Sequence, residues 1–75
     1  MASVDELAKS GEKCLSEGKF FEALSYFEKS LTSDPNNPDL LNLKAAALRS
    51  LGRYDEASEC YNKSLELDPR DKASS

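Results

Sequence analysis

Apolar residues along this chain are spaced three and four positions apart, which places them on one face of an α-helix. They form four groups, and each group predicts one helix with an apolar stripe. In chain order the groups are Leu7, Gly11 and Cys14, then Phe20, Ala23, Leu24, Phe27 and Leu31, then Leu41, Ala45 and Leu48, and finally Tyr54, Ala57, Tyr61 and Leu65. No stretch alternates as a strand would, so the pattern predicts an all-α protein of four antiparallel helices.

Two of the expected helices have clear start signals. Ser3 and Glu6 have the spacing at which the serine and glutamate side chains can satisfy free amides at a helix start. Asn37 precedes Pro38, and asparagine as a cap with proline in the first turn is a favourable start. The first helix is therefore expected to begin near Ser3, and the third directly after Asn37.

Glycine and proline mark the expected helix ends. Gly18 and Gly52 can adopt the positive φ that closes a helix, so they are expected to end the first and third helices. The second helix is expected to span about residues 19–33. The fourth is expected to end at Asp68 and Pro69, because proline has no amide hydrogen with which to continue it.

One stretch of the sequence occurs twice. Residues 18–36, GKFFEALSYFEKSLTSDPN, align without a gap with residues 52–70, GRYDEASECYNKSLELDPR, at an offset of 34 residues. Eight of the 19 aligned positions are identical, and Phe27 is replaced by the similar Tyr61. The repeat predicts two similar helical hairpins, the second stacked on the first.

Small residues in both copies predict how each hairpin is packed. Gly11 and Ala45 fall where the paired helix must approach closely. Four large aromatic rings are expected to fill the space beside such small residues, namely Phe20, Phe27, Tyr54 and Tyr61. Small residues facing large ones at a fixed period allow two antiparallel helices to nest.

The composition fits one small folded domain. The chain has 75 residues, of which 39% are hydrophobic and 32% charged, an ordinary balance for a folded protein. Its net charge is −4 and it has no run of lysine or arginine, which disfavours a nucleic-acid or anionic-membrane partner. No apolar stretch approaches the length of a membrane span, and residues 1–13 lack the apolar core of a secretion signal. A cytoplasmic location is therefore expected.

The strongest candidate for covalent chemistry is the thiol of Cys60, which precedes Tyr61. A reactive thiol needs a base or a lowered pKa. The chain has no histidine, and the nearby Glu56 and Glu59 would raise the thiol pKa. Cys60 and Cys14 are therefore expected to be buried free thiols with a packing role.

Acidic residues offer no better catalytic site. Asp55 and Glu56 are consecutive, so on a helix they point about 100° apart and cannot converge on one atom. Residues 34–39 are rich in aspartate and asparagine but lack the central glycine and final glutamate of a calcium loop. An enzyme, a metal site and a bound cofactor are therefore not expected.

The period of 34 residues and its motif resemble the tetratricopeptide repeat (TPR) family. The matching positions are Gly18, Phe20, Ala23, Phe27, Leu31 and Pro35 in the first copy, and Gly52, Tyr54, Ala57, Tyr61, Leu65 and Pro69 in the second. The resemblance implies a short right-handed α-solenoid that forms a single domain over residues 1–75. Repeat 1 would cover about residues 4–37 and repeat 2 about residues 38–71, with a frayed tail at 72–75.

TPR proteins are mostly non-enzymatic scaffolds whose first helices line a concave groove. The resemblance therefore implies a protein–protein interaction module, an adaptor that binds a peptide or a partner helix. The groove positions that it implies are Asp5, Ala8, Glu12 and Leu15 in the first repeat, and Asp39, Asn42, Ala46 and Arg49 in the second. Of these, Arg49 is the best candidate for contact with a partner's carboxylate.

Some TPR proteins clamp the C-terminal carboxylate of chaperones with lysine and asparagine side chains. The equivalent positions in the two repeats of this chain hold Ala8, Glu12 and Leu43. Lys9 and Asn42 each miss such a position by one residue, which rotates the side chain by about 100° around the helix. Because Glu12 would repel a carboxylate, no chaperone-tail clamp is expected.

The outer side of the fourth helix offers an alternative interface. Repeat arrays usually contain three or more repeats, and a repeat at the end of an array leaves one face uncovered. Tyr61, Leu65 and Leu67 are expected on this edge, and Leu67 is expected to be the most exposed. The alternative function is therefore a self-associating unit, or a fragment of a longer array, that uses this edge.

Overall fold

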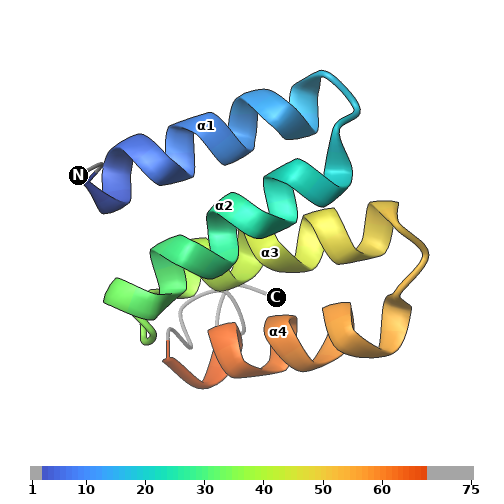
Figure 1. The fold of residues 1–75 in the computed structure, drawn as a ribbon. Helices are drawn as coiled ribbons and strands as arrows, with labels where there is room; N and C mark the ends of the chain where they lie inside the picture. Colours follow the sequence, from blue (N-terminus) through green and yellow to red (C-terminus); the bar gives the residue numbers. More distant parts are fainter. Residues whose placement is uncertain (1–2, 68–75) are drawn as a thin grey trace.

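The structure is a computed structural model that describes residues 3–67. Over these residues the chain forms four α-helices and no strand (Figure 1). They are α1 (Val4–Ser16), α2 (Phe20–Ser33), α3 (Pro38–Ser50) and α4 (Tyr54–Leu67). We call α1 and α2 the first hairpin, and α3 and α4 the second hairpin. The predicted fold class, an all-α solenoid of two helical hairpins, is confirmed.

Both predicted helix starts are confirmed. Ser3 caps α1, since its Oγ accepts a hydrogen bond from the amide of Glu6 at 3.2 Å. Asn37 caps α3 with two bonds, because its Oδ1 accepts from the amides of Asp39 at 3.0 Å and Leu40 at 3.3 Å. These bonds satisfy amides that have no partner within the helix.

The two hairpins turn in the same way. Gly18 has a φ of 81° and Gly52 a φ of 82°, as predicted. In the first hairpin the amide after the glycine donates to Cys14 O at 2.8 Å, and in the second the equivalent amide donates to Leu48 O at 2.9 Å. Each bond closes the preceding helix in the manner of a Schellman motif. The predicted stop at residues 68–69 and the tail at 72–75 lie outside the described residues.

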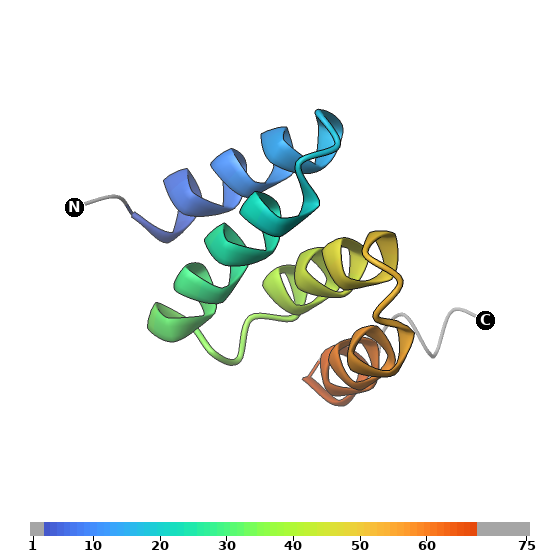
Figure 2. The ribbon, with the colours of Figure 1, turned by 45° about the vertical axis from the view of Figure 1, so that its right-hand side comes forward.

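Each helix packs against the next one along the chain. α1 also meets α3 over a short region, whereas α2 and α4 are not in contact. Among the described residues, α3 therefore has three neighbouring helices and α4 has only one (Figure 2).

The core is centred on Phe27 of α2, which is fully buried. Gly11 of α1 lies against this ring, because a Cβ atom on Gly11 would come within 2.5 Å of Phe27 Cε1. The other buried residues of this core come from all four helices and are Cys14, Ala23, Leu24, Ala45, Ala47, Leu48 and Ala57. The close approach that the sequence predicted at Gly11 is confirmed.

Two predictions of burial on α4 are wrong. Tyr54 exposes 64% of its surface, although its ring was expected to fill space in the second hairpin. Cys60 is half-buried rather than buried. Both residues belong to a helix that packs against α3 alone in the described part of the chain. Conversely, Leu40 and Ala47 are buried although they lie outside the predicted stripe, because α3 has neighbours on several sides.

Candidate functional site

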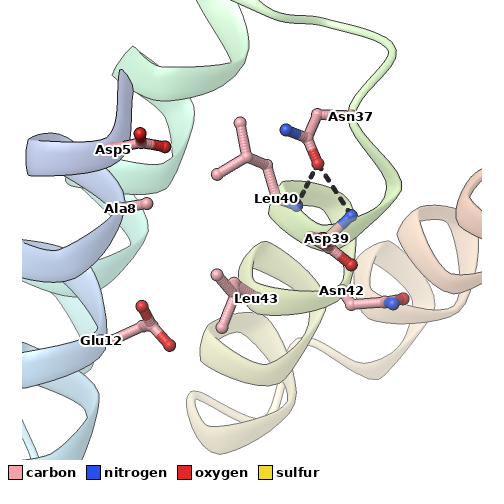
Figure 3. Close-up of a pocket in the computed structure, with 8 residues that line it drawn as sticks. All are labelled: Asp5, Ala8, Glu12, Asn37, Asp39, Leu40, Asn42 and Leu43. Carbon is pink, nitrogen blue, oxygen red and sulfur yellow. Dashed lines mark hydrogen bonds between the residues drawn. The ribbon is translucent and has the colours of Figure 1, made fainter. Parts of the chain in front are cut away.

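A cavity of about 490 Å³ lies between α1 and α3. We call it the α1–α3 groove (Figure 3). It is lined by Asp5, Ala8, Glu12, Asn37, Asp39, Leu40, Asn42 and Leu43. Five of these residues belong to the set of eight groove positions that the sequence predicted.

Three residues of α1 form one wall of the groove. Asp5, Ala8 and Glu12 are spaced three and four residues apart, so they lie on one face of the helix. Asp5 and Glu12 project from α1 toward α3, with the small Ala8 between them (Figure 3). Both carboxylates are exposed to solvent, whereas Ala8 is half-buried. This wall is therefore acidic at its rim and apolar at its centre.

The first two turns of α3 form the opposite wall. Leu40 and Leu43 point toward α1 (Figure 3), and Leu40 is only 3% exposed. Asp39 is exposed, and Asn42 is half-buried with its carboxamide directed away from α1. Sequence reasoning placed Leu43 only at a position equivalent to the clamp of some TPR proteins, and it did not place Leu40 in the groove, because a single groove face was assigned to each helix. Each leucine directly follows a predicted groove residue, Asp39 or Asn42. This adjacency is the feature of the sequence that could have indicated that the leucines line the groove.

Asn37 lines the groove, but its side chain is already hydrogen-bonded within the chain. Its Oδ1 accepts the two capping bonds of α3, and its Nδ2 donates to Asp34 Oδ2 at 2.9 Å. The side chain is thus held in place by bonds on both of its polar atoms. Its contribution is to fix the start of α3, and thereby the positions of Asp39 and Leu40.

The groove carries three carboxylates, and none of its lining residues is basic. Asp5, Glu12 and Asp39 form no ion pair with any side chain in residues 3–67. The ion pairs of this region lie elsewhere and join Lys19 to Glu17, Lys44 to Glu28, and Arg53 to Glu56. The groove is therefore a site of negative charge without an internal counter-charge.

Three predicted groove residues do not line the cavity. Leu15 is half-buried and packs against the core. Ala46 is half-buried and Arg49 is exposed, both in the second half of α3. The α1–α3 groove therefore lies beside the first half of α3 and does not extend along its second half. A contact between Arg49 and a partner's carboxylate stays a prediction.

The edge residues of α4 form a partly covered strip. Tyr61 and Leu65 are half-buried, and Leu67 exposes 39% of its surface. Leu67 is thus the most exposed of the three, as predicted. On the side of α4 that faces α3, the buried Ser64 donates its Oγ hydrogen to Pro38 O at 3.2 Å.

Neither thiol has the environment of a nucleophile. Burial raises the pKa of Cys60, and the nearby Glu59 and Glu56 raise it further against the opposing effect of Lys44. Burial also raises the pKa of Cys14, whose Sγ lies 3.8 Å from an oxygen of Glu22. Both thiols therefore stay protonated at neutral pH, which agrees with a packing role.

Residues 3–67 contain neither a group of metal ligands nor a helix of membrane-spanning character. In residues 3–67 no three cysteine, aspartate or glutamate side chains are grouped so that they could hold a metal ion. Over the same residues, every helix is too short or too polar to cross a membrane.

A comparison with protein families decides what kind of hairpin this is. The sequence model of the family described as tetratricopeptide repeat matches residues 38–71, which begin at the first residue of α3. The chain belongs to the TPR family. The first hairpin has the same glycine turn and the same helix lengths as the second, so the chain holds two tandem TPR hairpins.

Relatives of this TPR chain are found in distant organisms. An Hsp70-Hsp90 organising protein of Plasmodium falciparum is 41% identical over 61 residues, 81% of this chain and 24% of that protein. An uncharacterised protein of Methanocaldococcus jannaschii is 40% identical over 60 residues, 80% of this chain and 70% of that protein. A tetratricopeptide repeat and J domain-containing co-chaperone of Fusarium oxysporum is 39% identical over 66 residues, 88% of this chain and 13% of that protein.

The chain thus spans a quarter or less of the Plasmodium and Fusarium proteins. Together, the TPR match and these relatives make it a protein–protein interaction module. The clamp positions that the TPR resemblance implied, Ala8, Glu12 and Leu43, all line the α1–α3 groove.

Proposed function

We propose that this TPR chain is a non-catalytic adaptor that binds a segment of a partner protein in the α1–α3 groove. The observation that carries the proposal is the cavity of about 490 Å³ between the two helices. Binding pockets commonly have volumes of about 300–1,000 Å³ and combine an apolar lining with a few polar groups. Here Leu40 and Leu43 supply the apolar lining, and Asp5 and Glu12 supply polar groups.

The walls of this groove are built on packed helices, which supports the proposal. α3 is capped by Asn37 and contacts three other helices, and α1 is locked against α2 where Gly11 meets Phe27. A groove whose walls are already in place loses little conformational entropy when a ligand binds. The site is therefore suited to a short peptide segment that becomes ordered on binding.

The names of two relatives connect them with chaperones, one as an Hsp70-Hsp90 organising protein and one as a co-chaperone. To this chain we extend only the general role of joining proteins. A chaperone's C-terminal carboxylate is a poor ligand here, because Ala8, Glu12 and Leu43 occupy the clamp positions. A cytoplasmic location agrees with such a role and stays a prediction.

A pair of phenylalanine substitutions tests the groove. Ala8→Phe places a ring inside the cavity, whereas Ser25→Phe places the same ring on the exposed surface of α2. Partners captured from a cell extract by the wild-type chain should be retained by Ser25→Phe and lost by Ala8→Phe. If both variants, with unchanged helical circular dichroism, retain the same partners, the binding site lies elsewhere.

The exposed edge of α4 supports a second candidate function, self-association. α4 packs only against α3 in the described residues, and Leu67 exposes 39% of its surface. Sedimentation equilibrium at rising concentration should then show dimers, and Leu67→Lys should abolish them without unfolding the chain. A strict monomer at every concentration would contradict this candidate.

A further inference from the structure

The α1–α3 groove has a charge and a shape that specify the class of its ligand, provided that a partner segment binds there as proposed above. We propose that the groove takes a basic segment of a partner protein, with a lysine or arginine side chain lying across the half-buried Ala8 and Leu43. This ligand is opposite in charge to the carboxylate that the clamp of some TPR proteins holds.

Charge complementarity is the first argument. The groove presents Asp5, Glu12 and Asp39, and no residue that lines it is basic. None of the three carboxylates is paired with a cation from residues 3–67. A carboxylate ligand would meet uncompensated repulsion, whereas an ammonium or guanidinium group supplies the missing counter-charge.

The apolar surface between these carboxylates is the second argument. Asp5 and Glu12 are seven residues apart, so about 10 Å of helix separates them. The methyl group of Ala8 lies between them, and Leu40 and Leu43 face this gap from α3 (Figure 3). Lysine and arginine combine a long aliphatic stem with a charged head. The stem can pack on Ala8 and Leu43, which are only half-buried, while the head reaches a carboxylate at either end.

Other ligand classes fit the groove less well. The described residues hold no cluster of acidic side chains able to hold a metal ion, so the acids are not arranged as metal ligands. A neutral apolar segment would cover Ala8 and Leu43 but would leave the acidic rim without a partner. The polar atoms of Asn37 are already bonded within the chain and add no further specificity.

A displayed library of random peptides, selected on the wild-type chain, supplies a probe without assuming a partner. We expect the selected peptides to be enriched in lysine or arginine next to aliphatic residues. One selected peptide is then synthesised in three forms: unchanged, with norleucine in place of the basic residue, and with an amidated instead of a free C-terminus. Binding should fall with norleucine and should not change with amidation.

Charge-neutralising variants test whether the carboxylates of the groove cause the preference for basic peptides. Asp5→Asn and Glu12→Gln should each weaken the unchanged peptide about two- to fivefold, which is the range for exposed ion pairs, and the double variant should weaken it further. A matched control is needed because the net charge of −4 attracts any basic peptide. The control is Glu59→Gln with Glu66→Gln, which removes two exposed carboxylates from α4 and should leave the affinity unchanged at physiological salt.

Chemical shifts of the ¹⁵N-labelled chain separate the failure of this inference from that of the proposed function. A selected peptide could shift signals only in α1 and the first half of α3 and yet bind through acidic residues or its free carboxylate. That outcome would overturn the basic-ligand inference and leave the proposed function standing. Three outcomes would count against both the inference and the proposed function. They are shifts confined to α4, equal losses of peptide affinity in the groove and control variants, and a library that yields no binding peptide.

Discussion

The two hairpins have the same helix lengths, 13 and 14 residues, and the same glycine turns, yet they are buried to different extents. Phe27 of α2 is fully buried because α1 covers one side of the helix and α3 another. Tyr61 occupies the equivalent place on α4 and is only half-buried, because α3 is the one described neighbour of that helix. Burial in this fold therefore depends on how many helices surround a position, and a repeated sequence does not ensure it.

Truncating the two equivalent rings should give the largest contrast between the hairpins. Phe27→Ala removes a fully buried ring and should cost about 3–5 kcal/mol, enough to unfold most of a domain this small. Tyr61→Ala removes a half-buried ring and should cost about half as much or less. Urea unfolding followed by circular dichroism measures both. Equal losses would show that α4 is covered as completely as α2.

Substituting the small residues opposite these rings should destabilise both hairpins, but for different physical reasons. Gly11→Ala would place a Cβ atom 2.5 Å from Phe27 Cε1, and the buried ring cannot easily move. We expect this overpacking to cost about 1–3 kcal/mol, although alanine is otherwise the better helix former. Adding Phe27→Leu should recover part of the loss.

The reverse change at the equivalent position is the control. Ala45→Gly introduces no clash, so its cost should be about 1–2 kcal/mol, from the poorer helix propensity of glycine and from the loss of one fully buried methyl group. If Gly11→Ala instead stabilised the chain in thermal unfolding, the helices of the first hairpin would be further apart than the structure has them.

Two equivalent serines offer a smaller contrast. Ser64 donates to Pro38 O of the neighbouring helix at 3.2 Å, so Ser64→Ala should cost about 1 kcal/mol. Ser30 donates to Tyr26 O within its own helix at 2.9 Å, and such local bonds add little, so Ser30→Ala should be close to neutral. Denaturant midpoints of the two variants measure the difference. A similar cost at both positions would deny a role for the bond between helices.

The helix caps should give the smallest contrast. Asn37 makes two capping bonds and a third bond to Asp34, and Asn37→Ala should cost about 1 kcal/mol or slightly more. Ser3 makes one exposed bond to the amide of Glu6, and Ser3→Ala should cost about 0.5 kcal/mol. Thermal unfolding midpoints suffice for the comparison, and a larger loss at Ser3 would reverse the expected order.

Local signals predicted the helices well because each signal acts through its immediate neighbours. The side chains of Ser3 and Asn37 cap the two helices that they were predicted to start. Gly18 and Gly52 adopt positive φ at the two helix ends where it was predicted. The pairing of Gly11 with the large ring of the opposite helix also followed from the repeat, because small and large residues recur together.

Side-chain exposure on α4 and the complete groove lining could not be predicted in the same way. Tyr54 carries the sequence signal of a packed ring, and only the number of surrounding helices shows that it is exposed. Leu40 and Leu43 lie outside the apolar stripe that the sequence predicted for the third helix, yet they form the apolar wall of the α1–α3 groove. A single helical stripe cannot describe α3, whose surface is divided among three neighbours and a cavity.

The central place of α3 links ligand binding to the motions of the chain. A partner that binds in the groove stabilises the folded arrangement of α1 and α3, and α4 is held in place through α3. Amide hydrogens of α4 exchange with solvent when that helix detaches, and detachment is easiest for a helix with one neighbour. Only openings that also disrupt α3 are suppressed by the ligand. The change in exchange rates along α4 on binding would therefore show how often this helix opens alone and how often it opens together with α3.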